Sequence, residues 1–246
     1  MGGTGNMGSR VARLLEADGH EVLAASRATG VDAYTGQGLG EAFAGADIIV
    51  DCLGAASRGA KACIDFHVTT AGNIIRAARA AGVNRLLCLS IINAREPSVN
   101  RFMGYYQGKA AQERAYLLSP LHVTILRTTQ WHDFARRFSR TMRVGRWAFV
   151  PRMQSQPVAP DVVARLMRDT VEAADTSPRI VELAGPEARD MAELARILLS
   201  GEEPAVRVVG IPGLGLKVFS GGLLPPVGVP LDSETFDQWL EGGRRA

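Results

Sequence analysis

The sequence begins with a loop of evenly spaced glycines that leads directly into a helical pattern. Gly2, Gly5 and Gly8 recur at every third position, and an amphipathic run starts at Ser9. Glycines at this spacing let a chain turn tightly, bring backbone N–H groups close to a pyrophosphate, and pack the next helix against a sheet. A structural turn is the alternative, because the chain holds 27 glycines. We expect the loop to cradle a dinucleotide through Gly2, Thr4, Gly5, Asn6, Met7 and Gly8.

The segment before this loop is unusually short. Loops of this kind follow a buried apolar strand, whereas only Met1 precedes Gly2. That strand is central in such folds, so a sheet without it would leave unpaired backbone groups on the neighbouring strands. We expect that the first strand is missing from the chain as written, and that the natural chain carries about six to eight further apolar residues before Gly2.

Beyond the loop, short apolar runs alternate with helical patterns. This alternation is typical of a parallel sheet wound with helices. Strands are predicted at residues 21–25, 47–52, 85–90 and 123–127, with a short one near Val31. Helices are predicted at residues 9–17, 40–44, 68–81 and 105–118. The pattern predicts an α/β fold of the Rossmann type, with a doubly wound parallel sheet.

After Arg127 the alternation becomes less regular. Helices are predicted at residues 132–142, 160–173, 190–199 and 233–240, and a strand at residues 147–151. Residues 210–230 are rich in glycine and proline, which is typical of a loop or lid. We therefore expect a nucleotide-binding core over residues 1–150, with a small C-terminal substrate-binding or lid region over residues 151–246 packed on the same domain.

The composition favours a protein that acts on a small-molecule substrate. Its 28 basic and 25 acidic residues nearly balance, so neither nucleic acid nor a membrane surface is an expected partner. The three cysteines have no C-x-x-C or Cys/His spacing, and no segment has the pattern of a membrane span or a secretion signal. We expect a cytoplasmic monomer or homodimer without a metal site.

Ser26 and Arg27 end the predicted strand that follows the first helix. In dinucleotide-binding folds this position contacts the adenosine ribose, where an acidic residue favours the 2′-hydroxyl and an arginine favours the 2′-phosphate. Arg27 therefore predicts a preference for NADP(H), with NAD(H) as the alternative. The other interpretation of Arg27 is an ordinary solvated arginine at the end of a strand.

A second pattern places a tyrosine and a lysine one helical turn apart. Tyr105 and Lys109 are separated by four positions in a predicted helix, so they share one face. An adjacent ammonium stabilises a phenolate and brings a tyrosine towards the working range of an acid–base group. Ser90 ends a predicted strand and could hydrogen-bond the same substrate oxygen. Two alternatives remain: a surface pair without a reactive role, and the neighbouring Tyr106 in place of Tyr105.

Together these motifs resemble the atypical short-chain dehydrogenase/reductases, and in particular the NmrA-like NAD(P)-binding group. The resemblance extends from Gly2 to about Leu199 and rests on the glycine loop, residues 89–91, Tyr105-x-x-x-Lys109 and residues 125–130. It implies a Rossmann fold with Tyr105 as the acid–base group. It also implies that Lys109 holds the ribose and lowers the pKa of the tyrosine, and that Ser90 contacts the substrate oxygen.

The resemblance also implies further contacts to the cofactor. The loop at Leu53 and Gly54 matches the place where related folds pass beneath the riboses, and Thr128 follows a strand that approaches the nicotinamide. Asp51, near the end of a predicted buried strand, needs a partner or a role because an isolated buried charge is costly. His132 is either a substrate contact or a satisfied polar residue.

The most direct hypothesis is an NAD(P)-dependent oxidoreductase that prefers NADP(H) and transfers hydride to or from a small carbonyl, enone or quinone-like substrate. Its catalytic residues would be Tyr105, Lys109 and Ser90. One alternative is a regulatory protein of the NmrA type, which senses NAD(P) without turnover. Another is a nucleotide-sugar epimerase or dehydratase, although the stretch after Phe149 looks short for a sugar-nucleotide domain.

Overall fold

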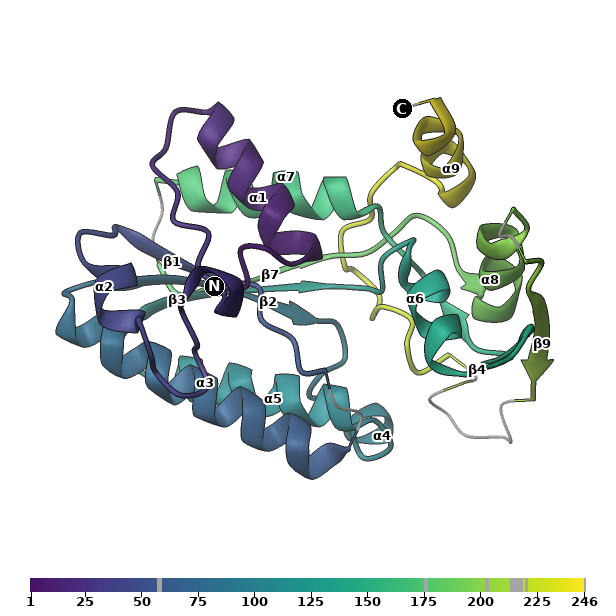
Figure 1. The fold of residues 1–246 in the computed structure, drawn as a ribbon, viewed down its shortest axis with the longest axis horizontal. Coiled ribbons are helices and arrows are strands. Elements are labelled where there is room, and N and C mark those ends of the chain that lie inside the picture. The colour runs from purple at the N-terminus through teal and green to yellow at the C-terminus, as the bar shows by residue number, and fades with distance from the viewer. Residues whose placement is uncertain (57–58, 175–176, 202–203, 213–218, 220, 246) are drawn as a thin grey trace. The chain divides into compact units, whose positions relative to one another are not determined.

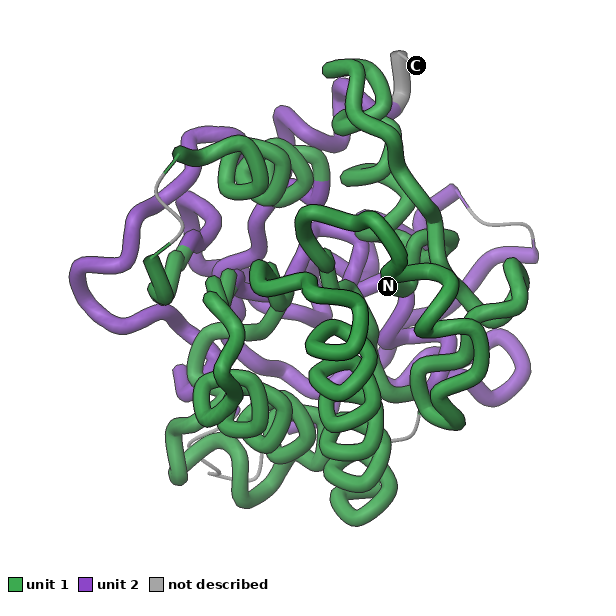
Figure 2. Tube along the Cα trace, turned by 90° about the vertical axis from the view of Figure 1, so that its left-hand side faces the viewer, with its two compact units in different colours: residues 1–127, 161–182 green, residues 128–160, 183–246 purple. Residues whose placement is uncertain are grey.

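The computed structural model describes residues 1–56, 59–174, 177–201, 204–212, 219 and 221–245 (Figure 1). The chain divides into two compact units, coloured separately in Figure 2. Unit 1 comprises Met1–Arg127 and Asp161–Glu182, and unit 2 comprises Thr128–Pro160 and Leu183–Ala246. Unit 1 therefore contains most of the expected nucleotide-binding core. It also contains a second segment, Asp161–Glu182, which a single domain boundary at residue 150 does not anticipate.

Unit 1 is built on a parallel sheet. Among the described residues, four strands pair in the order β1-β2-β3-β7. Their bounds are β1 (Ile48–Asp51), β2 (Arg85–Ile91), β3 (His122–Thr128) and β7 (Arg179–Leu183). β1 runs parallel to β2, with Val50 opposite Leu87. Three of these strands, β1, β2 and β3, coincide with apolar segments predicted as strands from the sequence. Strands of a parallel sheet are rich in apolar residues because helices cover both faces of the sheet.

Helices cover both faces of this sheet (Figure 1). α1 (Asn6–Ala17) and α7 (Pro160–Glu172) lie on one face, and α3 (Ala60–Ala80) and α5 (Gly104–Leu117) on the other. Arg168 of α7 pairs with Asp18, just after α1, at 2.8 Å. The short elements of the unit are a 3₁₀ turn (Arg27–Thr29), α2 (Leu39–Phe43) and α4 (Pro97–Asn100). The prediction of a Rossmann-like α/β fold is confirmed.

Two expected strands do not form. Residues 21–25 and the segment near Val31 are not strands in the structure. At the end of residues 21–25, the Ala25 carbonyl accepts one hydrogen bond from the Gly3 amide, at 3.0 Å. Near Val31, an isolated bridge joins Asp32 to Gln37. A strand needs a ladder of such bonds along its length. The apolar pattern of residues 21–25 therefore gave the wrong prediction, and Leu23 is left 62% exposed.

The packing of α3 on α5 depends on a glycine. A Cβ added at Gly108 would lie 2.7 Å from His67 Cδ2 and 2.8 Å from the backbone oxygen of Cys63. Gly72, in the middle of α3, has no atom within 4 Å of an added Cβ. Both glycines lie inside α-helices, but a side chain would meet close neighbours only at Gly108.

We expect opposite effects from alanine at these two positions. Gly72→Ala should raise the free energy of unfolding by about 0.5–1 kcal/mol, since alanine is the better helix former. Gly108→Ala should lower it by about 1–3 kcal/mol, because the new methyl group overpacks the helix pair. Urea unfolding of both variants measures the difference, and equal shifts would contradict the close packing at Gly108.

Unit 2 contains smaller sheets and three longer helices among its described residues. The helices are α6 (Phe134–Thr141), α8 (Met191–Leu199) and α9 (Phe236–Arg245). One sheet pairs β4 (Arg143–Val144), β5 (Trp147–Pro151) and β9 (Arg207–Ile211), and the other pairs β6 (Gln154–Ser155) with β8 (Arg189–Asp190). Asp190 caps α8 by accepting from the Ala192 and Glu193 amides, as its sequence pattern indicates. β9 was not expected.

The structure describes part of the expected lid. Residues 213–218 and 220, within the glycine- and proline-rich stretch, lie outside the described residues. In the rest of the chain that the structure describes, no helix combines the length and apolar character needed to cross a membrane.

Candidate functional site

The glycine loop forms an open cradle at the start of α1. The Gly5 amide donates to the Gly2 carbonyl at 2.9 Å, which closes the turn. Gly5 is the N-cap residue of α1 and no side chain caps the helix, whose first turn carries no acidic residue. N–H groups of a helix's first turn have no partner inside the helix, and they attract anions. Thr4 and Gly5 are exposed at the tip of the loop.

The third glycine of the loop is required by close packing. A Cβ added at Gly8 would overlap the Gly2 carbonyl oxygen and lie 2.9 Å from Gly3 Cα. Gly8 and the neighbouring Met7 are buried under the loop. The cradle therefore exists because Gly8 has no side chain. This is the arrangement that lets a backbone approach a pyrophosphate, so the loop fits a dinucleotide.

The expected ribose position lies beside this loop. The hydrogen bond from Gly3 to the Ala25 carbonyl places Ser26 and Arg27 next to the cradle. Ser26 begins the 3₁₀ turn, and its amide donates to Thr29 Oγ1 at 2.9 Å. Arg27 is exposed at the start of the turn, so its guanidinium is accessible to a ligand.

The second expected cofactor loop also borders the cradle. The Cys52 amide donates to the Met1 carbonyl at 3.1 Å, and Leu53 Cδ2 lies 3.5 Å from the position of a Cβ on Gly2. Gly54 follows, and a Cβ placed there would lie 3.7 Å from the hydroxyl oxygen of Tyr105. The glycine loop, the Leu53–Gly54 loop and Tyr105 are therefore brought together in unit 1.

Lys109 is buried and makes three hydrogen bonds. Its side chain is 2% exposed, and Nζ donates to the carbonyls of Leu53 and Leu89, each at 2.8 Å, and to Gln112 Oε1 at 2.9 Å. An ammonium has three donors, so all of them are used within the protein. Burial by itself lowers the pKa of Lys109, but the acidic groups around it, led by Tyr105, raise the pKa above its ordinary value.

Ser90 belongs to a second buried network. Its hydroxyl donates to Glu113 Oε1 at 2.6 Å, and the Glu113 carboxylate pairs with Arg127 through two bonds of 3.0 and 2.7 Å. Arg127 also reaches Glu182 at 3.2 Å. The single O–H donor of Ser90 is thus used by Glu113, so its oxygen can accept a hydrogen bond from a substrate hydroxyl but has no proton to donate to a carbonyl.

Two further sequence candidates lie in unit 2. Thr128 ends β3, and its hydroxyl oxygen accepts from the Trp131 indole at 3.2 Å. His132 is fully buried, with the rings of Phe236 and Trp239 at centroid distances of 5.4 and 5.2 Å. These contacts are consistent with His132 as a packed core residue.

His67 was missed by the sequence analysis. It lies on α3 with no exposed surface, and its ring packs edge-on against Tyr105 at a centroid distance of 6.2 Å. Neither ring nitrogen has a hydrogen-bond partner among the described residues. Burial, and to a smaller extent the charge of Lys109, lowers the pKa of His67 to about 2.

This depressed pKa predicts a pH dependence of stability. In the unfolded chain His67 takes up a proton near its ordinary pKa of about 6.5, whereas in the folded protein it stays neutral down to about pH 2. The contribution of neutral His67 to the free energy of unfolding is therefore fully present above pH 6.5, and it is lost as the pH falls below that value. Between pH 6 and pH 5 we expect His67→Leu to reduce the slope of unfolding free energy by about 1.2 kcal/mol per pH unit. Urea titrations at each pH test this, and an unchanged slope would contradict it.

The partners of Asp51 are also clear only in the structure. The Asp51 side chain has no exposed surface, and it accepts from Gln112 Nε2 at 2.8 Å and Tyr116 Oη at 2.6 Å. The buried charge therefore has the partners that the sequence analysis called for. Gln112 stands three residues after Lys109, on the same helix face, so its spacing indicates a contact with Lys109 but not with Asp51.

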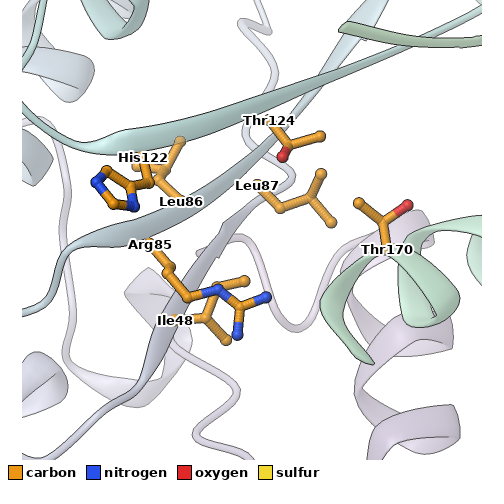
Figure 3. A pocket seen from close by; sticks show the side chains of 7 residues that line it. All are labelled: Ile48, Arg85, Leu86, Leu87, His122, Thr124 and Thr170. Carbon is orange, nitrogen blue, oxygen red and sulfur yellow. The ribbon is translucent and has the colours of Figure 1, made fainter. Parts of the chain in front are cut away.

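Figure 3 shows the side chains that line a small pocket in unit 1. It lies where β1, β2 and β3 begin, near α7, and has a volume of about 10 Å³. That is room for about one water molecule. Its lining residues are Ile48, Arg85, Leu86, Leu87, His122, Thr124 and Thr170. Ligands of open α/β sheets bind outside the carboxyl ends of the strands, so this pocket is not the candidate site.

Comparison with solved structures identifies the fold. MoeE5 in complex with UDP-glucose and NAD has a TM-score of 0.74 at 17% identity, covering 99% of this chain and 97% of that one. A nucleoside-diphosphate-sugar epimerase from Staphylococcus aureus has a TM-score of 0.66 at 18% identity, covering 98% and 94%. The triphenylmethane reductase of Citrobacter sp., complexed with NADP(H), has a TM-score of 0.58 at 20% identity, covering 86% and 77%.

No curated protein matches the chain. A family model described as NAD(P)H-binding, by contrast, matches residues 2–173. The match begins at the first glycine of the cradle and ends just after α7, so it includes the cradle, the Leu53–Gly54 loop and the Tyr105–Lys109 pair. It spans most of the 246 residues. The chain therefore belongs to the NAD(P)H-binding family.

Proposed function

We propose that the protein is an NADP(H)-preferring oxidoreductase that transfers hydride to or from a small carbonyl, enone or quinone-like substrate. The observation that carries the proposal is the position of Tyr105. Its hydroxyl lies over Gly54 of an expected cofactor loop, and the buried, charged Lys109 follows one helical turn later. A proton donor beside a cofactor loop is what reduction of a carbonyl needs.

Each residue has a defined task in this proposal. Tyr105 would give a proton to the substrate oxygen during reduction, or take one during oxidation, while the bound nicotinamide supplies or accepts the hydride. The Lys109 ammonium would stabilise the phenolate that Tyr105 becomes. Because Leu53, Leu89 and Gln112 use its donors, its effect on Tyr105 would be mainly through charge. Contact with the ribose, implied by the resemblance, would require one of these bonds to be exchanged.

Ser90 and the remaining cofactor residues complete the proposed site. To contact the reacting oxygen, as the resemblance implies, Ser90 would have to turn its O–H away from Glu113, because a reacting alcohol has a single proton and gives it to Tyr105. The pyrophosphate would lie on the backbone N–H groups of residues 2–8. Thr128, the last residue of β3, would approach the nicotinamide, as the resemblance to NmrA-like proteins implies.

The experiment that tests this function is a turnover assay. The protein is incubated with NADPH and separate panels of aldehydes, ketones, enones and quinones, and oxidation of NADPH is followed. We expect at least one panel to give turnover above the rate without protein. Binding of NADPH without oxidation by any panel would favour the alternative of a regulatory protein that senses NAD(P).

Arg27 carries the proposed preference for NADP(H). We expect Arg27→Asp to raise the ratio of the NADPH Kd to the NADH Kd by about 10- to 100-fold, since a charge-assisted bond to the 2′-phosphate is lost. Arg79→Asp is the matched control, because Arg79 is exposed near the end of α3. Titration of both variants with both cofactors measures the ratio. A ratio unchanged by Arg27→Asp would overturn the proposed role.

Nucleotide sugars are a second candidate substrate class. The chain aligns with 97% of MoeE5 and 94% of the Staphylococcus aureus epimerase. The expectation that its C-terminal region is too short for such a fold is therefore wrong. Incubation with NAD and UDP-glucose distinguishes the two classes, because an epimerase alters the sugar without net consumption of cofactor.

A further inference from the structure

Four hydrogen bonds form a closed ring around the Leu53–Gly54 loop. Asp51 Oδ2 accepts from Gln112 Nε2 at 2.8 Å, and Gln112 Oε1 accepts from Lys109 Nζ at 2.9 Å. Lys109 donates in turn to the Leu53 carbonyl at 2.8 Å. The Leu53 amide donates to Asp51 Oδ1 at 2.9 Å, which closes the ring. The end of β1, the loop after it and α5 are thereby joined.

The three side chains of the ring are almost completely shielded from water, whereas Leu53 is half-buried. Asp51 and Gln112 have no exposed surface, and Lys109 is 2% exposed. Breaking one bond in such a place leaves a buried donor or acceptor without a partner, which costs more than the bond itself contributes. None of the three side chains can therefore turn independently of the others.

The amide of Gln112 separates the two charges of the ring. Its oxygen faces the ammonium and its nitrogen faces the carboxylate, so Lys109 and Asp51 are linked without a direct ion pair. Burial lowers the pKa of Lys109, whereas Tyr105, Cys88 and then Asp51 raise it. Lys109 thus remains charged while its ammonium stays directed at the loop below Tyr105.

We propose that Asp51 and Gln112 are positioning residues, which hold the Lys109 ammonium and the Leu53–Gly54 loop in one fixed arrangement through this ring. The proposal rests on the proposed function, because it assigns the arrangement to cofactor binding and to Tyr105. The proposal goes beyond the proposed function because it assigns a role to two buried residues that the proposed function does not use. Their effect passes through Lys109 and the backbone of Leu53.

The test compares two variants that remove one hydrogen bond from the same oxygen. Gln112→Met breaks the ring at Asp51 Oδ2 and also removes an acceptor from Lys109. Tyr116→Phe removes the bond of 2.6 Å from Tyr116 to Asp51 Oδ2 but leaves the ring closed. Tyr116 is equally buried, so both variants should lose stability. Melting temperatures of both variants check that they fold.

We expect Gln112→Met to raise the Kd for NADPH by about tenfold, and to lower kcat with any substrate found while KM changes less. Tyr116→Phe should change the Kd by less than about threefold. Hydrogen exchange at the Leu53 amide should become faster in Gln112→Met alone, because its bond to Asp51 is part of the ring. Equal Kd values for the two variants, whether raised or unchanged, would overturn the proposal.

The outcomes separate this proposal from the proposed function. A wild-type protein that binds NADPH but turns over no substrate contradicts the proposed oxidoreductase, and the Kd and exchange measurements still decide the role of Gln112. If Gln112→Met does not fold, Gln112→Glu replaces it, since Glu keeps an acceptor for Lys109 but places a carboxylate against Asp51. Failure of both to fold, where Tyr116→Phe folds, would show that the ring only supports the fold and would overturn the proposal.

Discussion

Replacing Tyr105 by phenylalanine is expected to lower kcat by about 10²- to 10⁴-fold, the usual contribution of a positioned acid–base group. The Kd for NADPH should stay within about twofold of the wild-type value, because only a hydroxyl is removed and the cradle of residues 2–8 is untouched. The ring of Tyr105 still packs against His67 and Tyr106 after this change. Steady-state kinetics with the best substrate of the panels, together with NADPH titration, measure both quantities.

Tyr106 provides the control for this variant. It neighbours Tyr105 on α5 but is 2% exposed, and the sequence alone leaves open which of the two is reactive. We expect Tyr106→Phe to keep kcat within a few-fold of wild type. Full activity in Tyr105→Phe would contradict the assignment, and loss of activity in Tyr106→Phe alone would transfer the role to the neighbouring residue.

Alanine at Gly8 is expected to remove most NADPH binding. Its methyl group would overlap the Gly2 carbonyl oxygen and crowd Gly3 Cα at 2.9 Å, so the loop must move away from the helix. Backbone N–H groups that no longer converge lose their bonds to the pyrophosphate. We expect the Kd for NADPH to rise by about 100-fold or more, since bonds to charged groups contribute about 1.5–3 kcal/mol each. Titration by protein fluorescence measures the change.

Gly40→Ala is the matched control. Gly40 lies in α2, is exposed, and has no atom within 4 Å of an added Cβ. The same chemical change there should leave the Kd for NADPH within about twofold, since nothing has to move. If Gly8→Ala bound NADPH as tightly as Gly40→Ala, the glycine loop would be a structural turn, which is the alternative the sequence leaves open.

The core of the fold could be predicted because it depends on local patterns. β1 and β2 contain unbroken runs of apolar residues, and β3 contains Val123, Ile125 and Leu126. Such apolar segments are typical of strands that are covered on both faces. Residues 21–25 have a similar pattern but form no strand, because pairing depends on a neighbour that no local pattern reports. β9 was missed for the same reason, since its partner β5 lies about sixty residues earlier in the chain.

In the candidate site, too, residues in local motifs could be predicted from the sequence, whereas contacts between residues far apart in the chain could not. The loop glycines, Arg27, Tyr105 and Lys109 could be proposed from spacing and position. The partners of Asp51 could not, since Gln112 and Tyr116 are separated from it by 61 and 65 residues. The use of all three Lys109 donors and the Ser90–Glu113 bond likewise depend on side-chain directions in the folded chain.

The most direct test of the account is transfer of labelled hydride. NADPH that carries deuterium in place of both hydrogens at C4 of its nicotinamide is incubated with the protein and its best carbonyl or enone substrate, and the product is analysed by mass spectrometry. The account predicts one deuterium in the product for each NADPH oxidised, and loss of this transfer in Tyr105→Phe. NADPH that binds but transfers no deuterium to any aldehyde, ketone or enone of the panels, and is oxidised by none of the quinones, would contradict the proposed hydride transfer.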